Sequence, residues 1–239
     1  MSLAVVLVEP AGPLNVGSVA RLCANFSVNE LRLVAPRCDH LGDEARLMAV
    51  HGEALLEQAQ LFPTLEAALA DCRRVVATSG RIEEEALPLN GPAEALSWLQ
   101  ASDTDASSAP AALVFGREDR GLSNAELLQA GRILRLETSE AYASMNLSHA
   151  VAVCLHELRR CPAPTDPQPE PCQREQLEAA LSDAEDLLLE VGFLYPHTAQ
   201  ARMAKLRALL QRAEIRDEEV ALLRGMVRQL RWASQRDCP

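Results

Sequence analysis

The sequence predicts an α/β fold, in which a mostly parallel sheet carries helices on both faces and a small all-helical extension follows it. Short, continuously apolar runs alternate with amphipathic stretches through residues 1–160, and this alternation is typical of parallel strands separated by helices. Residues 161–171, CPAPTDPQPEP, contain five prolines, which exclude a helix and indicate an extended linker. Beyond the linker, apolar residues recur every three or four positions, as in VALLRGMVRQLRW, which predicts amphipathic helices.

The strands are predicted at apolar runs of four or five residues, at 4–8, 31–34, 74–78, 111–115 and 133–136. The helices between and after these strands are predicted where apolar residues follow a helical period, near 16–25, 65–71, 93–99, 124–130 and 147–160. Three further helices are predicted beyond the linker, roughly at 173–191, 198–212 and 217–233. The chain is therefore expected to consist of an α/β domain (1–160), a Pro-rich linker (161–172) and a helical C-terminal extension (173–239).

The composition, with 48% hydrophobic and 24% charged residues, is that of an ordinary globular protein. No apolar run approaches the roughly 18 residues that span a bilayer, so no membrane segment is expected. The opening MSLAVVLVEPAG lacks a basic stretch before its apolar run, and we interpret it as a strand rather than a signal peptide. The seven cysteines include no CxxC pair, which predicts reduced thiols in a cytoplasmic protein and no zinc site.

The net charge of −11 argues against bulk, non-specific nucleic-acid binding, which favours a basic surface. The segment from His197 to Arg236 has the opposite balance, because basic residues outnumber acidic ones within it. A local basic patch is therefore compatible with the negative net charge of the chain.

Polar loops follow four of the predicted strands, namely EPAGPLNVGSVAR (9–21), TSGR (78–81), GREDRGLSN (116–124) and ETSEAYASMNLSHA (137–150). Ligands of open α/β sheets bind beyond the carboxyl ends of the strands, so these loops predict a pocket at one edge of the sheet. The sequence lacks the GxGxxG, GxxxxGK[ST] and GxSxG motifs of dinucleotide, nucleotide and α/β-hydrolase sites. His149 and His156 have no partner at zincin spacing, and we interpret them as packing or surface residues.

One of these loops places four charged residues, 117–120, directly after an apolar strand. Solvated turns are more commonly built from Gly, Asn, Asp and Ser. The run is therefore either an ordinary charged surface loop or the rim of a site.

Three loops together resemble the motifs of a known family. The N-x-G-x-x-x-R pattern in NVGSVARLCANF, the FGREDRGLSNAEL turn and the SMNLSHAVAV segment resemble, in order and spacing, the three motifs of the SPOUT superfamily of RNA methyltransferases. They are most similar to the TrmH-like branch, which methylates ribose 2′-hydroxyls, and in particular to TrmJ-type tRNA enzymes. The extension, with ARMAKLRALLQRAEI and EEVALLRGMVRQLRW, looks like the TrmJ-type C-terminal region. The resemblance implies 2′-O-methylation of a tRNA nucleotide, by default in the anticodon loop.

The resemblance also implies a C-terminal trefoil knot in the α/β domain, and a homodimer whose active site lies at the subunit interface. It implies S-adenosylmethionine as cofactor, without a metal, held in a bent shape by backbone groups of the knot loops. The residues expected to line its pocket are Thr78, Ser79, Gly80, Gly116, Leu136, Ser144 and Met145. The alternative for each is a plain turn or strand-end residue, and this alternative is stronger for Gly80 because many relatives carry TSAR in place of TSGR.

The resemblance assigns catalytic roles to five residues: Arg21, Asn15, Glu118, Ser144 and Asn146. Arg21 is expected near the ribose 2′-hydroxyl and the adjoining phosphate, and the structural alternative is a helix-surface arginine. Family accounts often name this arginine as the general base. A guanidinium stays protonated in proteins, so phosphate binding and stabilisation of charge on the attacking oxygen is the more defensible role.

The other four residues have expected roles and alternatives of their own. Glu118 is expected to fix Arg21 through a bidentate pair, which would make the charged turn part of an active-site rim. Ser144 is expected to hydrogen-bond the 2′-hydroxyl or the cofactor carboxylate. Asn15 and Asn146 each have an alternative as a helix N-cap.

Two other functions stay open at this point: a ribosomal RNA 2′-O-methyltransferase, and a catalytically inactive RNA-binding protein of the same fold. The acidic balance and the TrmJ-like extension weigh weakly against the first, and the presence of all five motif residues weighs against the second. One departure is Ser27, which stands where relatives commonly have glycine. It lies at a helix end, where we expect it to make the turn less favourable without affecting the chemistry.

Overall fold

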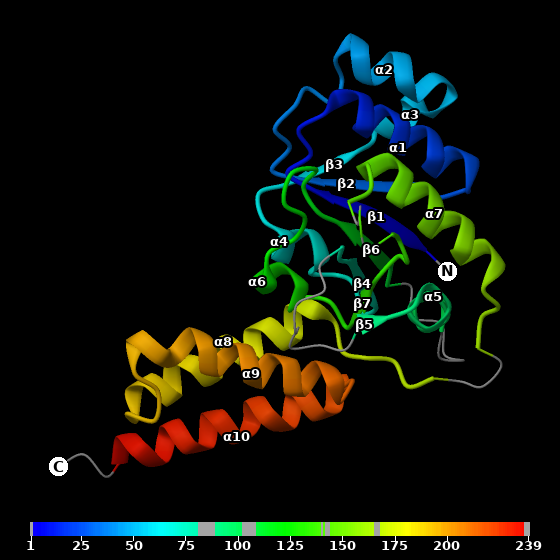
Figure 1. The fold of residues 1–239 in the computed structure, drawn as a ribbon. Helices are drawn as coiled ribbons and strands as arrows, with labels where there is room; N and C mark the ends of the chain where they lie inside the picture. Colours follow the sequence, from blue (N-terminus) through cyan, green and yellow to red (C-terminus); the bar gives the residue numbers. More distant parts are fainter. Residues whose placement is uncertain are drawn as a thin grey trace.

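The computed structural model describes residues 2–80, 89–101, 109–139, 141, 144–164 and 168–236. Its centre is a seven-stranded sheet in which every pair of neighbouring strands is parallel, in the order β3-β2-β1-β6-β4-β7-β5 (Figure 1). The predicted α/β fold with a mostly parallel sheet is confirmed. The trefoil knot stays a prediction.

The strands are β1 (Leu3–Val8), β2 (Glu30–Val34), β3 (Gln60–Phe62), β4 (Val75–Thr78), β5 (Leu89–Asn90), β6 (Ala111–Phe115) and β7 (Arg132–Leu134). The helices of the α/β part are α1 (Pro13–Asn25), α2 (Asp43–Ala49), the 3-10 turn η1 (Val50–Gly52), α3 (Glu53–Glu57), α4 (Leu65–Leu69), α5 (Pro92–Gln100), α6 (Asn124–Leu127) and α7 (Leu147–Arg160). The C-terminal helices are α8 (Arg174–Glu190), α9 (Pro196–Arg212) and α10 (Asp217–Arg236).

Helices cover both faces of the sheet, and this explains why its central strands are continuously apolar. Alternate residues of β1 belong to different cores: Leu3, Val5 and Leu7 pack on one face, and the residues between them on the other. The first face carries α1, α5 and α7, with α2 and α3 packed outside α1, and the second carries α4 and α6 (Figure 1). Every residue of β1 and β6 is buried as a result.

Short elements account for the differences from the sequence-based assignment. The edge strands β3 and β5 have three and two residues, and β3 is partly exposed, so neither has the apolar run that predicts a strand. Helices α2 and α3 were also not predicted. Strand β7 ends at Leu134, which leaves Leu136 in the following loop. Ser27 has a φ of 58°, in the left-handed region that favours glycine, which agrees with the less favourable turn expected there.

The proline-rich segment leads into three helices that pack around an apolar core of their own. Backbone hydrogen bonds join its end to two other parts of the chain: the N–H of Cys172 donates to the Ile215 carbonyl (2.8 Å), and the N–H of Arg174 donates to the Cys72 carbonyl (3.0 Å). The end of the segment is thus attached to the α/β part as well as to the bundle.

Helix α9 docks the bundle against the second face of the sheet. Ala208 of this helix belongs to the core under that face, and Gln211 donates a side-chain hydrogen bond to the Leu128 carbonyl at the end of α6. The ion pairs Arg73–Asp217 (2.8 Å) and Arg132–Glu214 add to the contact. The bundle is therefore fixed to the α/β part through packing, hydrogen bonds and charge.

Candidate active site

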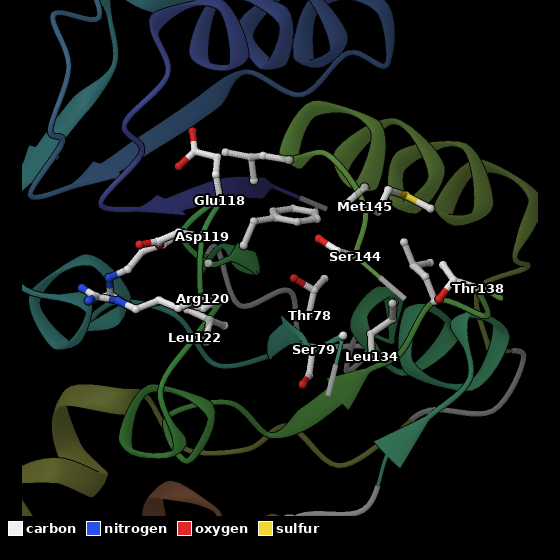
Figure 2. Close-up of a pocket in the computed structure, with 18 residues that line it drawn as sticks. Thr78, Ser79, Glu118, Asp119, Arg120, Leu122, Leu134, Thr138, Ser144 and Met145 are labelled. Carbon is white, nitrogen blue, oxygen red and sulfur yellow. The ribbon is translucent and has the colours of Figure 1, made fainter. Parts of the chain in front are cut away.

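The carboxyl ends of β4, β6 and β7 and the segment before α7 surround a cavity of about 510 Å³ (Figure 2). The seven residues predicted to bind the cofactor all line it: Thr78, Ser79, Gly80, Gly116, Leu136, Ser144 and Met145. Cavities of this size hold small organic ligands. Folding thus brings loops that are far apart in the sequence to one edge of the sheet, as the order of strands and helices predicted.

The lining combines apolar walls, a few hydroxyl groups and, on one side, the charged turn 117–120. Phe115, Leu134 and Leu147 are buried and form part of the wall. Figure 2 shows the side chains of Thr78 and Ser144 in the middle of the cavity. Such a lining suits a ligand that has a flat apolar part and a polar sugar.

A second cavity, of about 480 Å³, adjoins the first. Four residues line both cavities: Glu118, Ser144, Met145 and Leu147. Asn15 and Asn146 line the second cavity alone. Four of the five predicted catalytic residues therefore meet at this junction, and Arg21 is the exception.

Hydrogen bonds connect the motif residues of three loops. Asn146 donates from Nδ2 to Oδ1 of Asn15 (3.0 Å), and Asn15 donates from Nδ2 to Oε1 of Glu118 (3.2 Å). The Glu118 carboxylate also accepts from the backbone N–H groups of Ala11 and Gly12, each at 3.1 Å. The carboxylate is thus the fixed end of a chain of side chains that runs toward α7.

The environment of Glu118 keeps it ionised. Burial raises the pKa of this carboxyl, but hydrogen bonds from backbone N–H groups and from Asn15 outweigh burial and lower the pKa below its ordinary value. An ionised carboxylate only accepts hydrogen bonds. Asn15 must therefore present its amide N–H to Glu118 and its carbonyl oxygen to Asn146, so the orientation of both amides is set.

The two asparagines differ in their relation to the helices. Asn146 caps α7, because its Oδ1 accepts from the backbone N–H groups of Ser148 (2.9 Å) and His149 (3.3 Å). The capping alternative for Asn146 is confirmed, and the same side chain also contacts the site. The capping alternative for Asn15 is wrong, since α1 begins at Pro13 and Asn15 lies within its first turn.

The charged turn is held by ion pairs on both sides. Arg117 pairs with Glu9, just after β1, and with Glu126 in α6, where its Nη2 and Nη1 atoms lie 2.8 and 2.9 Å from the two carboxylate oxygens. Glu126 also completes a capping box with Ser123 at the start of α6. Arg117 therefore fastens the turn that carries Glu118 to two neighbouring elements, which a plain surface loop would not require.

The remaining residues of this turn serve its geometry. Asp119 and Arg120 are exposed, and Arg120 lies 3.5 Å from the Glu9 carboxylate. Gly121 has a φ of +68°, which glycine adopts at little cost. A Cβ on Gly116 would lie 2.3 Å from the carbonyl carbon of Gly121. Glycine at 116 is therefore required by the tight turn itself.

Arg21 lies apart from both cavities. It is exposed on α1 and has no hydrogen-bond or ion-pair partner in the part of the chain that the structure describes. Six residues separate it from Asn15, which is about 9 Å along a helix and on a different side of it. The expected pair between Glu118 and Arg21 is not formed among the described residues, because the carboxylate binds the loop before α1 instead.

Sequence reasoning missed two residues that support the site, Glu9 and Glu126. Glu126 had a signal, since Ser123 and Glu126 have the spacing of a capping box. Glu9 had none beyond its place after a strand, and its φ of 45° is known only from the structure.

Among the described residues, no group of three His, Cys, Asp or Glu side chains is arranged to hold a metal ion. No helix in those residues has the length and hydropathy of a membrane span.

Comparison with known proteins follows the two parts of the chain. Residues 2–156 match the SpoU rRNA Methylase family, and residues 175–238 match the C-terminal domain of the tRNA methyltransferase TrmJ. The chain is 34% identical over 235 residues to the tRNA (cytidine/uridine-2′-O-)-methyltransferase TrmJ of Cronobacter sakazakii, covering 95% of this chain and 94% of the relative. It is 38% identical over 160 residues to the tRNA (cytidine-2′-O-)-methyltransferase TrmJ of Methanocaldococcus jannaschii, and this match covers 65% of this chain and 66% of the relative. The crystal structure of TrmJ from Z. mobilis is similar with a TM-score of 0.85 and 30% identity, covering 97% of this chain and 100% of that one.

Proposed function

The chain belongs to the SpoU rRNA methylase family, and on that premise we propose that it transfers the methyl group of S-adenosylmethionine to a ribose 2′-hydroxyl of tRNA. A tRNA substrate is favoured over ribosomal RNA because the C-terminal helices match the TrmJ domain and TrmJ relatives align over nearly the whole chain. The target nucleotide is proposed to lie in the anticodon loop, and the protein in the cytoplasm.

One observation carries the proposal: the residues expected for the cofactor line one cavity, and the residues expected for catalysis, except Arg21, line the cavity beside it. The first cavity fits S-adenosylmethionine in its chemistry. Its apolar wall, with Leu134 and Leu136, suits a flat adenine ring, and the hydroxyl groups of Thr78 and Ser144 suit the ribose and the amino-acid end. A cofactor seated there leaves the second cavity for the sugar that receives the methyl group.

S-adenosylmethionine supplies a methyl group activated by its bond to a positively charged sulfur. In the transfer, the 2′-oxygen forms a bond to the methyl carbon, the carbon–sulfur bond breaks to leave a neutral thioether, and the hydroxyl proton passes to water. The protein's part is chiefly to hold the hydroxyl in line with that bond. Asn15 and Asn146, whose amides are oriented by Glu118, are placed to position the sugar. Ser144, which lines both cavities, is placed to hydrogen-bond the hydroxyl.

Arg21 is proposed to act in a homodimer, in the site of the other subunit. Its exposure on α1 and its lack of a partner among the described residues leave it available for that role. Helices α1 and α7 pack side by side and expose the apolar residues Leu14 and Val153, and the adjoining α2 exposes Leu47. A subunit contact on this side would cover these side chains. Arg21 of the partner subunit would then bind the phosphate beside the target sugar and stabilise charge on its oxygen.

The reaction is tested by incubating the protein with methyl-labelled S-adenosylmethionine and bulk tRNA, or with ribosomal RNA, followed by alkaline hydrolysis. A 2′-O-methylated nucleotide resists alkali, so label is expected in an alkali-resistant dinucleotide from tRNA. Label in ribosomal RNA alone would favour the ribosomal alternative. Label in neither RNA would overturn the enzymatic assignment and leave an inactive RNA-binding protein.

The shared site is tested by mixing two inactive variants, Arg21→Ala and Ser144→Ala. If Arg21 serves the partner's site, each mixed dimer has one site with both residues intact. Random mixing should then restore about a quarter of the wild-type activity. No recovery above the two separate variants would contradict the exchange of Arg21 between subunits.

A further inference from the structure

The connection between α8 and α9 exposes aromatic side chains. Phe193 is 60% and Tyr195 55% exposed, although the whole chain has only eight Phe, Tyr and Trp residues. Leu194, between them, is buried in the core of the bundle. Because the middle residue points inward, its two neighbours project outward from the same short segment. Exposing two large rings forgoes the stabilisation that their burial would give, so a role outside the fold is the natural explanation.

The backbone of this connection is well fixed. Gly192 adopts a φ of +75° directly after α8, and the N–H of Leu194 donates to the Leu188 carbonyl (2.9 Å). Pro196 starts α9 on the other side. The rings are therefore presented on a short, restrained loop, which lowers the entropy lost when a ligand binds them.

Polar and positively charged groups accompany both rings. The His197 ring stacks beside Tyr195, with centroids 6.0 Å apart and an interplanar angle of 24°. The Arg202 guanidinium lies 5.7 Å from the Phe193 ring centroid and donates to the Phe193 carbonyl (3.0 Å). We call residues Phe193, Tyr195, His197 and Arg202 the aromatic loop.

Two basic residues of α9 at the aromatic loop differ from some other charged groups of the bundle in having no ion pair among the described residues. Arg202 and Lys205, one turn apart on α9, have no acidic partner in the described ranges of the chain. Some other arginines of the bundle do have one: Arg207 pairs with Glu178 and Arg224 with Asp183. Arg202 thus presents a positive charge beside an exposed ring, and Lys205 follows it one turn further along α9.

We propose that the aromatic loop is a stacking platform for unpaired bases of the RNA substrate, with Arg202 and Lys205 attracting the adjoining phosphates. The proposal rests on the proposed function, because it assigns the surface to the same tRNA. Aromatic rings beside arginines are the usual means of binding unpaired nucleotides, since every base has a face that can stack. The positive charge favours RNA over an apolar protein partner, which would leave that charge buried and unpaired.

The test compares Phe193→Ala/Tyr195→Ala with a control, Leu222→Ala/Met226→Ala. The control removes apolar side chains that are 74% and 52% exposed on α10, away from the aromatic loop. Binding of labelled tRNA, followed by fluorescence anisotropy, needs no methyl transfer. The loop variant is expected to raise the Kd about tenfold to a hundredfold, and the control to leave it within about twofold. In the methylation assay the loop variant should raise KM and leave kcat unchanged.

A second comparison distinguishes stacking from a general loss of binding. The loop variant should lose affinity for an unpaired oligouridine and keep its affinity for an RNA duplex of equal length. An unchanged Kd for tRNA and oligouridine would overturn the proposal, as would an equal loss for both RNAs. A fall in oligomeric state by analytical ultracentrifugation would overturn it in favour of a subunit contact. If the protein methylates no RNA, the proposed function fails, whereas the anisotropy result still decides whether this loop binds RNA.

Discussion

Replacing Glu118 tests whether one carboxylate holds the loop before α1 and orients Asn15. Three donors converge on Oε1: the N–H groups of Ala11 (3.3 Å) and Gly12 (3.1 Å), and Nδ2 of Asn15 (3.2 Å). The Ala11 N–H also approaches Oε2 at 3.1 Å. In Glu118→Gln an amide NH₂ replaces Oε2 and faces the Ala11 N–H, while neutral hydrogen bonds to Oε1 persist. In Glu118→Ala all of these hydrogen bonds are lost.

The size of the effect follows from these contacts. A hydrogen bond to a charged group contributes about 1.5–3 kcal/mol and a neutral one about 0.5–1.5 kcal/mol. Ala11 is exposed, so its N–H regains water, and the low end of each range applies. We expect Glu118→Gln to lower the free energy of unfolding by about 1–2 kcal/mol and Glu118→Ala by about 2–3 kcal/mol. Because Asn15 loses its fixed partner, kcat should fall by about tenfold to a hundredfold.

Urea unfolding at pH 7 and initial rates of tRNA methylation measure the two effects. Asp186→Asn is the control, because it removes an exposed carboxylate of α8 that makes no hydrogen bond or ion pair with any residue the structure describes. Its unfolding midpoint and rate should match the wild type. If Glu118→Ala unfolds at the same urea concentration as Asp186→Asn, the carboxylate does not hold the loop. If its kcat is also unchanged, the orientation of Asn15 has no part in the reaction.

Three other perturbations give clear expectations. Arg21→Ala should bind S-adenosylmethionine with wild-type affinity by calorimetry but lose at least about a hundredfold in methylation rate, and weakened cofactor binding would contradict its assignment to the RNA. Gly17→Ala should lower the melting temperature, because a Cβ would lie 2.1 Å from the Ala45 carbonyl oxygen, whereas Gly225→Ala, with open space around it, should raise it; equal shifts would contradict the α1–α2 packing. The pKa of Glu126 is raised by burial but lowered more by its hydrogen bonds from Arg117 and Ser123, so its stabilisation is complete above the ordinary glutamate pKa of about 4.3 and is lost as the pH falls through the lower folded value. The urea midpoint should therefore be steady between about pH 7 and pH 5 and fall below that, and a midpoint that rises in acid would contradict this sign.

The main architecture was readable from the sequence because burial on both faces leaves a strong pattern. β1 and β6 are continuously apolar, and every residue in them is buried. The edge strands β3 and β5 were missed because two or three residues, partly exposed, carry no such pattern. Their pairing depends on the neighbouring strands, which local sequence does not report.

The sequence predicted which residues belong to the candidate site better than it predicted their contacts. The residues expected around the cofactor line one cavity, because loops at the ends of parallel strands meet at one edge. Which donor faces which acceptor was not readable, since it depends on side-chain positions across loops distant in the chain. Glu118 was expected to bind Arg21 and instead binds the backbone at Ala11 and Gly12. The proposed role of Arg21 in the site of a second subunit follows from the family resemblance and not from the pattern of residues around it.

The short helix α6 joins the two halves of the molecule. At its start Glu126 grips the turn that carries Glu118, and just past its end the Leu128 carbonyl receives the hydrogen bond from Gln211 of the bundle. Helix α6 therefore contacts both the bundle and the turn that borders the methyl-transfer pocket, in addition to the other contacts that fix the bundle to the α/β part. An RNA that binds both parts must place its target sugar at the distance that separates the bundle from the pocket. The fold can therefore select its substrate by dimensions as well as by chemistry.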